Sequence, residues 1–291
     1  MAAVPVQAAL LAALPQEVQP FLRRRRARRR RGTWPWWDFI MPAGMGVVLL
    51  TGMGETHARA GFAFLIDHFR PEMLLAVGFG GAVLPAPAPG EVVLGTGYYR
   101  YQPESGLVLP VPAPPAPAGL QQLLDRARER RLPLGPGTMV STPEILPKSR
   151  LLAPLLDLTL PVVDLETAAL AHLAREQGLP FVALRAVTDG AGEEIPGFIK
   201  TAVRRGKTPT PLAALGWLGK DARRLTHLTR LWQRSRRAAA HLALVLEAAV
   251  EWWWGEGRGS MAPVAQVSSP VEPPPTPPST IPFRVFRGGG R

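Results

Sequence analysis

The chain has 291 residues, 46% of them hydrophobic, which is enough to bury one globular core of about 200 residues with appendages. It contains no cysteine, which excludes disulfides, thiolate nucleophiles and cysteine-ligated metals. None of its five histidines pairs at i,i+4 spacing, so we expect no metal site. The net charge is +12, and most of it comes from one short segment, because eight arginines lie between Arg23 and Arg31.

Two apolar stretches superficially resemble membrane-directed segments. The stretch 1–14 lacks the basic residues that precede the apolar part of a secretory signal. The charge-free stretch 73–90 is broken by prolines and glycines, which do not suit a spanning helix. We therefore expect a protein that resides in the cytoplasm.

Strand and helix patterns alternate along residues 1–200. Buried strands are predicted at 4–13, 46–52, 73–80, 91–99, 160–166 and 180–190, and helices at 57–69, 121–131 and 167–178. Such alternation is typical of an α/β protein whose sheet carries helices on both faces. A basic insertion at 22–38 interrupts the pattern. Residues 209–254 predict two or three helices packed on the core, and residues 255–291, rich in proline and glycine, predict a disordered tail.

Carboxylic acids follow several predicted strands, at the sheet edge where α/β proteins bind ligands. Glu17 comes just after the first strand, and Asp164 and Glu166 end the fifth. Asp189 ends the last strand, before a glycine. A carboxyl group partly buried at a strand end can have a raised pKa and donate a proton. Each acid also has a structural explanation, because acids favour first helical turns, helix caps and turns.

The third predicted strand ends in the glycine-rich segment Gly78–Gly81, whose glycines would let backbone N–H groups approach a ligand closely. Tight turns use glycine too, so this signal alone does not separate the two roles. The G-x-G-x-x-G spacing of a dinucleotide site is missing, which argues against a Rossmann cofactor.

Six segments together resemble the nucleoside phosphorylase and methylthioadenosine/S-adenosylhomocysteine nucleosidase superfamily. They are ALPQEV (13–18), TGMGETHA (51–58), AVGFGGA (76–82), PGEVVLG (89–95), VSTPEIL (140–146) and VVDLETAALAHLAREQGLPFVALRAVTDGA (162–191). The resemblance implies a three-layer phosphorylase-like fold for residues 1–200, in which helices flank a central mixed β-sheet, and a C-terminal helical extension. It also implies a homo-oligomer that needs no cofactor, with phosphate as an alternative co-substrate.

Carried over to this chain, the resemblance implies roles for three acids. Asp189 would assist protonation of a purine at N7, Glu17 would orient or activate the attacking water, and Glu166 would bind the ribose hydroxyls. Cleavage of the N-glycosidic bond leaves negative charge on the purine and positive charge on the ribose. An acid at one end and a carboxylate at the other therefore suit the reaction.

The resemblance also implies residues that line the substrate. Leu165 stands where the family usually has a methionine that packs under the sugar, and its similar volume can fill that place. Gly80 and Gly81 would line the sugar or anion side. Main-chain groups near Ile145 and Leu146 would meet the base.

Within the superfamily, the V-D-L-E motif and the extension after residue 209 resemble a hopanoid-associated group that acts on adenosylhopane. Release of adenine from adenosylhopane is thus the leading hypothesis. A methylthioadenosine/S-adenosylhomocysteine nucleosidase is the first alternative. An inactive relative that binds membrane or nucleic acid is the second.

The attacking group is expected to be water. Phosphorolytic relatives hold phosphate with arginines near the first and third motifs, and these are missing here. Phe79 also replaces the serine that is usual in the glycine loop of the family. Arg59 or the arginine run remains an alternative phosphate site.

The run Arg23–Arg31 precedes the aromatic segment Trp34–Trp37. Three interpretations remain open for this pair. It is a solvated, disordered insertion, or a peripheral contact with the inner membrane surface that suits a lipid substrate, or, least favoured, a nucleic-acid site. Trp252–Trp254 could add an apolar lip for the same lipid or simply pack on the core.

Overall fold

The computed structural model describes residues 3–42, 44–114, 117, 119–204 and 222–253, and structural statements refer to these. Its strands are β1 (Val4–Ala12), β2 (Arg28–Arg30), β3 (Trp36–Met41), β4 (Gly44–Leu50), β5 (Phe69–Ala82), β6 (Val92–Gln102), β7 (Leu107–Pro110), β8 (Leu134–Ser141), β9 (Val162–Asp164) and β10 (Phe181–Asp189). Its helices are α1 (Pro15–Arg24), α2 (Glu55–His68), α3 (Leu120–Glu129), α4 (Lys148–Leu155), α5 (Thr167–Glu176), α6 (Gly197–Arg204) and α8 (Ala222–Glu251).

All the described strands belong to one mixed sheet. Its order is β10-β6-β8-β9-β5-β1-β4-β3-β2, with β7 added to β6. The long strand β5 pairs in parallel with β1 and β10 and antiparallel with β9. Because β5 contacts both β9 and β10, the strands β5, β10, β6, β8 and β9 close into a ring. The carboxyl ends of β1, β5 and β10 therefore lie at one end of the sheet, where the short strand β9 pairs with the last residues of β5.

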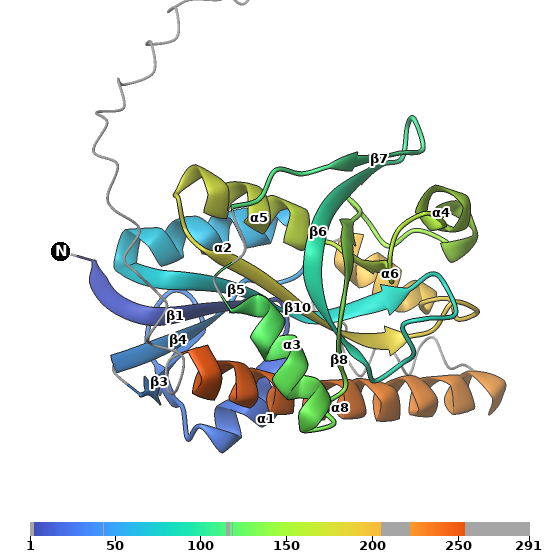
Figure 1. Ribbon diagram of the computed structural model, residues 1–291. Coiled ribbons are helices and arrows are strands. Elements are labelled where there is room, and N and C mark those ends of the chain that lie inside the picture. The colour runs from blue at the N-terminus through green and yellow to red at the C-terminus, as the bar shows by residue number, and fades with distance from the viewer. Residues whose placement is uncertain (1–2, 43, 115–116, 118, 205–221, 254–291) are drawn as a thin grey trace, which may run out of the picture. The chain divides into compact units, whose positions relative to one another are not determined.

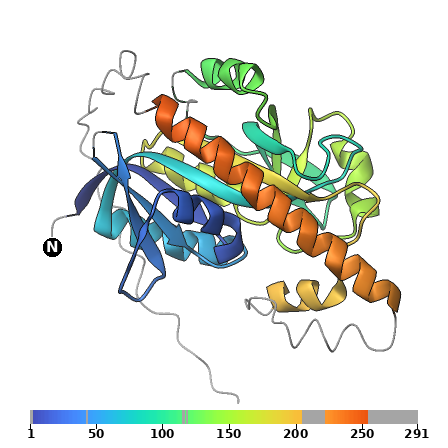
Figure 2. The same cartoon turned by 90° about the horizontal axis from the view of Figure 1, so that it is seen from below.

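Helices cover both faces of the sheet, as Figures 1 and 2 show. On one face, α2 and α5 pack over a core that includes Phe62, Leu65 and Leu170. On the other face, α1, α3 and α8 pack over a second core that includes Phe21 and Leu246. The three-layer architecture with a central mixed sheet, predicted from the sequence, is confirmed.

The ends of several elements differ from the sequence prediction. The strand predicted at 160–166 is only Val162–Asp164, because the chain turns at once into α5. Strand β8 was not predicted, since its Gly135, Pro136 and Gly137 suggest a loop. Of the helices predicted at 209–254, the described residues contain α8 alone. Residues 205–221 and the predicted disordered tail lie outside the described residues.

The basic insertion is ordered, which corrects the interpretation of a disordered segment. Helix α1 extends to Arg24, and β2 then pairs antiparallel with β3 at the edge of the sheet. The half-buried rings of Trp34 and Trp36 pack against Phe64 and Phe69, with centroid distances of 6.0 and 5.1 Å. These aromatic rings contribute to the core, because β3 continues the sheet beyond β4.

Among the described helices, none is both long enough and apolar enough to cross a membrane.

Helix α8 ends against α3, where Trp252 lies over Gly119. Gly119 and Gly178 both have left-handed φ, of +84° and +64°, but only at Gly119 would a methyl group overlap another side chain. We expect Gly178→Ala to cost about 1–2 kcal/mol of backbone strain. Gly119→Ala should cost about 1–3 kcal/mol more, because it also displaces Trp252. Urea denaturation measures both variants, and equal losses would show that displacing Trp252 costs no stability.

Candidate active site

A cleft opens at the end of the sheet where β1, β5, β9 and β10 finish, with a cavity volume of about 170 Å³. Most of its lining is apolar, and includes Met53, Phe79, Val83 and Leu151. All the site residues predicted from the sequence line this one cleft: Glu17, Gly80, Gly81, Ile145, Leu146, Leu165, Glu166 and Asp189. Residues from distant parts of the chain are thus brought together by the strand order.

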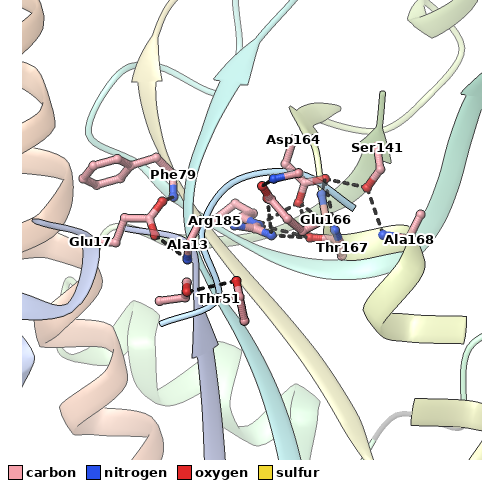
Figure 3. A network of polar contacts seen from close by, with 12 residues as sticks. Ala13, Glu17, Thr51, Phe79, Ser141, Asp164, Glu166, Thr167, Ala168 and Arg185 are labelled. Atoms are coloured by element: carbon pink, nitrogen blue, oxygen red, sulfur yellow. Dashed lines mark hydrogen bonds and ion pairs between the residues drawn. The ribbon is translucent and has the colours of Figure 1, made fainter. Parts of the chain in front are cut away.

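Glu17 lies in the first turn of α1, directly after β1, and its side chain is buried. Its Oε2 accepts hydrogen bonds from the backbone N–H groups of Ala13 (2.9 Å) and Leu14 (2.7 Å), and Oε1 accepts one from Phe79 (3.0 Å) (Figure 3). Burial raises the pKa of Glu17, while Arg185 and these N–H groups oppose the rise. A carboxylate has about four acceptor positions, so one remains for a ligand.

Glu166 is the residue just before α5, its side chain makes no capping hydrogen bond to that helix, and it is 6% exposed. Its Oε1 accepts a hydrogen bond from the backbone N–H of Gly54 (2.7 Å), and Oε2 lies 3.4 Å from Arg185 Nη2. Burial raises the pKa of Glu166 to about 7, with Arg185 lowering it and Asp164 raising it further. About two acceptor positions stay open toward the cleft.

Arg185 and Asp164 form a buried ion pair beneath the cleft, with 2.7 Å between Arg185 Nε and Asp164 Oδ2. Figure 3 places this guanidinium between Glu17 and Glu166. Arg185 also donates to Thr167 Oγ1, at 2.8 Å from Nη2. Although burial opposes its charge, Asp164, Glu166 and Glu17 raise the pKa of Arg185. Arg185 lies in the segment 162–191 that carries part of the family resemblance. That Asp164, Glu166 and Glu17 share its positive charge was not predicted from the sequence.

Asp164 has a structural role, in agreement with the helix-cap interpretation. It accepts hydrogen bonds from the hydroxyl groups of Ser141 (2.5 Å) and Thr167, and from the backbone N–H of Glu166 (3.3 Å). Ser141 Oγ in turn accepts one from the N–H of Ala168 (2.9 Å). The pair of acids therefore divides into one that fixes the start of α5 and one that faces the cleft.

Asp189 ends β10 at the other side of the cleft and is 4% exposed. Thr188 Oγ1 donates to its Oδ1 (2.8 Å), and Lys148 Nζ lies 2.6 Å from its Oδ2. Burial raises the pKa of Asp189, and the Lys148 ammonium opposes this rise. Lys148 was not singled out from the sequence, because a lysine between a loop and a short helix has the pattern of a surface residue.

The glycines of β5 are required by their neighbours. A methyl group on Gly81 would lie 2.7 Å from Asp189 Oδ2, and one on Gly80 would overlap Val162 of β9. These glycines therefore let β9 and β10 close on β5 and leave room for the acid. Leu165 lies between Asp164 and Glu166 in the sequence and lines the cleft.

Ile145 and Leu146 lie in the loop between β8 and α4, where Leu146 is buried in a small core with Leu151 and Leu155. Thr142 Oγ1 donates to the carbonyl of Glu144 (2.9 Å), which fixes the turn of this loop. The loop thus forms an apolar wall of the cleft on the same side as Lys148. Among the described residues, no His, Asp and Glu side chains are arranged to hold a metal ion.

The buried charges beneath the cleft should be necessary for stability. Arg185→Met leaves Asp164 and its neighbouring acids without their shared cation, and we expect a loss of about 3–5 kcal/mol at neutral pH. The loss should be smaller near pH 5, because Glu166, whose pKa is raised to about 7, is then protonated and needs no cation. Urea denaturation at the two pH values tests this. Arg150→Met, at an exposed arginine bonded to the Pro103 carbonyl, is the control and should cost less than about 1 kcal/mol.

Comparison with known proteins places this geometry in a family. Residues 1–208 match the model of the phosphorylase superfamily. A 5'-methylthioadenosine/S-adenosylhomocysteine nucleosidase of Geobacillus kaustophilus is 30% identical over 183 residues, which cover 54% of this chain and 74% of the relative. The enzyme of the same name from Geobacillus thermodenitrificans is 28% identical, over 68% of this chain and 92% of its own.

Solved structures share the fold. Futalosine hydrolase of Helicobacter pylori superimposes with a TM-score of 0.63 at 15% identity, covering 84% of this chain and 97% of its own. The 5'-methylthioadenosine/S-adenosylhomocysteine nucleosidase of the same organism has the same TM-score and identity, and covers 86% and 99%. Helix α8 lies beyond the segment that the family model matches. Through residues 1–208, which carry the whole predicted site, the chain belongs to the phosphorylase superfamily.

Proposed function

We propose that the protein is a purine nucleosidase, which hydrolyses the N-glycosidic bond of a nucleoside and releases adenine. The observation that carries this proposal is the placement of three differently partnered carboxyl groups, Glu17, Glu166 and Asp189, around one cleft. The nucleosidase names of the relatives support the same reaction class.

Asp189 acts at the base. As the bond from C1' to N9 breaks, its electron pair moves to the purine, and a proton passes from the Asp189 carboxyl to N7. A carboxyl group that burial keeps protonated to a higher pH than usual is suited to this step. Thr188 holds one oxygen of the carboxyl group, which fixes its direction.

Glu166 and Glu17 act at the sugar. The open acceptor positions of Glu166 suit the two ribose hydroxyl groups, and its charge favours the cationic sugar of the transition state. The remaining acceptor position of Glu17 suits one water molecule. As this water bonds to C1', it gives a proton to Glu17, whose raised pKa makes it a stronger base than an exposed carboxylate.

Water rather than phosphate is the proposed attacking group. Among the residues that the structure describes, the two buried cations near the cleft are engaged within the protein, Arg185 by Asp164 and Lys148 by Asp189. Arg59, considered from the sequence as a phosphate ligand, pairs with Glu55 (2.8 Å). A phosphate ion would have to break one of these pairs.

A lipid nucleoside, such as adenosylhopane, is the proposed substrate. Support comes from the resemblance of the V-D-L-E motif to the hopanoid-associated group and from the surface beside the cleft. Helix α4, which supplies Leu151 to the cleft wall, exposes Leu152, and Leu156 is exposed just after it. The neighbouring strand β7 exposes Leu107 and Leu109. These four leucines offer an apolar path for a tail on the ribose 5' position.

Peripheral contact with an anionic membrane is proposed for the exposed arginines of the basic segment: Arg23, Arg24, Arg26, Arg28, Arg29, Arg30 and Arg31. Because the neighbouring tryptophans pack on the core, this contact would be electrostatic, at about 1 kcal/mol per arginine near the surface. Co-sedimentation with vesicles that contain anionic lipid, weakening as salt is added, tests it. Preferential binding of oligonucleotides would instead favour the nucleic-acid alternative.

The acid is tested by Asp189→Asn. We expect adenine release to fall about 100- to 10,000-fold without unfolding, because the amide has no proton to give to N7. Asp157→Asn, at an exposed aspartate after α4, is the control and should leave the rate unchanged. Assays with and without phosphate identify the second product. Free ribose supports hydrolysis, whereas ribose 1-phosphate formed only with phosphate would replace it with phosphorolysis.

The proposed role of Glu166 in binding the ribose predicts that activity depends on pH. Below about pH 7 Glu166 takes up a proton and loses acceptor positions for the ribose, so kcat/KM should fall as the pH is lowered through this value. Glu166→Gln should raise KM strongly at every pH and remove the fall centred near pH 7, whereas a fall caused by protonation of the base Glu17 remains. Glu72→Gln, at an exposed glutamate of β5, serves as control. A wild-type profile that is flat down to about pH 5 would contradict the assignment.

The lipid substrate is tested by comparing adenosine derivatives with a long and a short 5' alkyl group. We expect a preference of about tenfold or more for the long chain, from the burial of several methylene groups. The double variant Leu152→Ser/Leu156→Ser should reduce this preference and leave turnover of methylthioadenosine unchanged. A wild-type preference for methylthioadenosine would reject the lipid and favour the methylthioadenosine/S-adenosylhomocysteine alternative.

A further inference from the structure

Lys148 is a buried lysine at the base end of the cleft, 9% exposed, on the first residue of α4. Its Nζ lies 2.6 Å from Asp189 Oδ2 and also donates to the backbone carbonyls of Asp189 (3.3 Å) and Gly190. The backbone N–H of Lys148 donates to Glu194 Oε1 (2.9 Å), which holds the start of the helix in place. A lysine is rarely buried to this degree unless its charge is paired.

The contacts of the ammonium group show how it can act. An ammonium has three hydrogens, and Lys148 directs them to three acceptors of the protein. A substrate atom would have to displace one of these bonds, so Lys148 is positioned to act through Asp189 rather than on the base. All three acceptors belong to Asp189 and the residue after it, so the side chain ties α4 to the end of β10.

We propose that Lys148 is a positioning residue for the acid, holding the Asp189 carboxyl group toward the base and balancing the charge that proton transfer leaves on it. The proposal rests on the purine nucleosidase function proposed above. In the step itself, the proton moves from Asp189 to N7 as the bond from C1' to N9 breaks. Lys148 keeps its three protons, and Asp189 takes up a proton from solvent after the base leaves.

Charge balance is needed because Asp189 is almost fully buried. Without a neighbouring cation, a carboxylate left in an apolar cleft would resist forming, and the proton would stay on the acid. Glu193 also faces Asp189 and raises its pKa, and it is itself paired with Arg234 of α8. Glu194 and Arg230 line the same small hollow beside Asp189. Of these groups, Lys148 is the cation in contact with the carboxyl group, and its charge favours loss of the proton.

The test compares Lys148→Met and Lys148→Arg with Lys200→Met, a control at a lysine of α6 that pairs with Glu194. We expect Lys148→Met to lower kcat for adenine release about 100-fold or more. The pH at which activity is lost on the alkaline side should rise by about one unit or more, because the acid holds its proton more tightly. Lys148→Arg keeps the charge and should recover much of the rate, and Lys200→Met should behave as wild type.

A double variant separates action through Asp189 from a general effect on folding. If Lys148 acts through the acid, adding Lys148→Met to Asp189→Asn should cause little further loss of rate. An unchanged alkaline limb in Lys148→Met, or an equal loss of rate in both backgrounds, would overturn the proposal.

The proposal can fail separately from the nucleosidase function. An active wild type with a normal Lys148→Met profile contradicts the role of Lys148 alone, whereas a wild type that releases no adenine contradicts the proposed function. Even then, the effect of Lys148 on Asp189 is measured by ¹³C NMR titration of the Asp189 carboxyl group. The signal of this group is assigned by its absence from the spectrum of Asp189→Asn. Its midpoint should rise in Lys148→Met, and an unchanged midpoint would overturn the charge-balancing role.

Discussion

The guanidinium of Arg185 is the charge on which the rest of the site depends. It lies beneath the cleft, in contact with Asp164 and Glu166 and close to Glu17, in an environment almost without solvent. Three carboxyl groups so close together would strongly repel one another if each were ionised. The cation allows one of them to brace α5 while the other two keep acceptor positions toward the cleft. Stability and chemistry are therefore supplied by the same buried group.

The closed arrangement of strands explains why these residues meet. Strand β5 pairs with both β9 and β10, so Gly80 and Gly81 lie where the two neighbouring strands end. A larger residue at Gly80 or Gly81 would push these strands apart and displace Asp189 at the end of β10. The resulting cleft has two distinct ends. Arg185 and Glu166 supply the charge at one end, and Asp189 with Lys148 supplies it at the other.

Much of the fold could be predicted from the sequence, because long apolar strands and amphipathic helices leave strong periodic patterns. The family motifs also located Glu17, Glu166 and Asp189, which lie in one cleft, although spacing alone could not separate them from helix caps and turns. Lys148 could not be found in this way, since its importance depends on a contact between α4 and the end of β10, 41 residues apart in sequence. The hairpin of β2 and β3 was missed because clustered arginines are typical of disorder, whereas Trp34 and Trp36 fasten it to the core.

The position of β2 gives the arginine run a consequence for the sheet itself. Strand β2 is the last strand on its side of the sheet, and Arg28, Arg29 and Arg30 form all of it. An outermost strand normally leaves backbone groups that a second chain can pair with, which leads to edge-to-edge aggregation. Here a second copy approaching in the same way would bring arginine against arginine, at a cost in repulsion and desolvation. The basic segment thus forms the edge of the sheet and disfavours pairing of this edge with a strand of a neighbouring molecule.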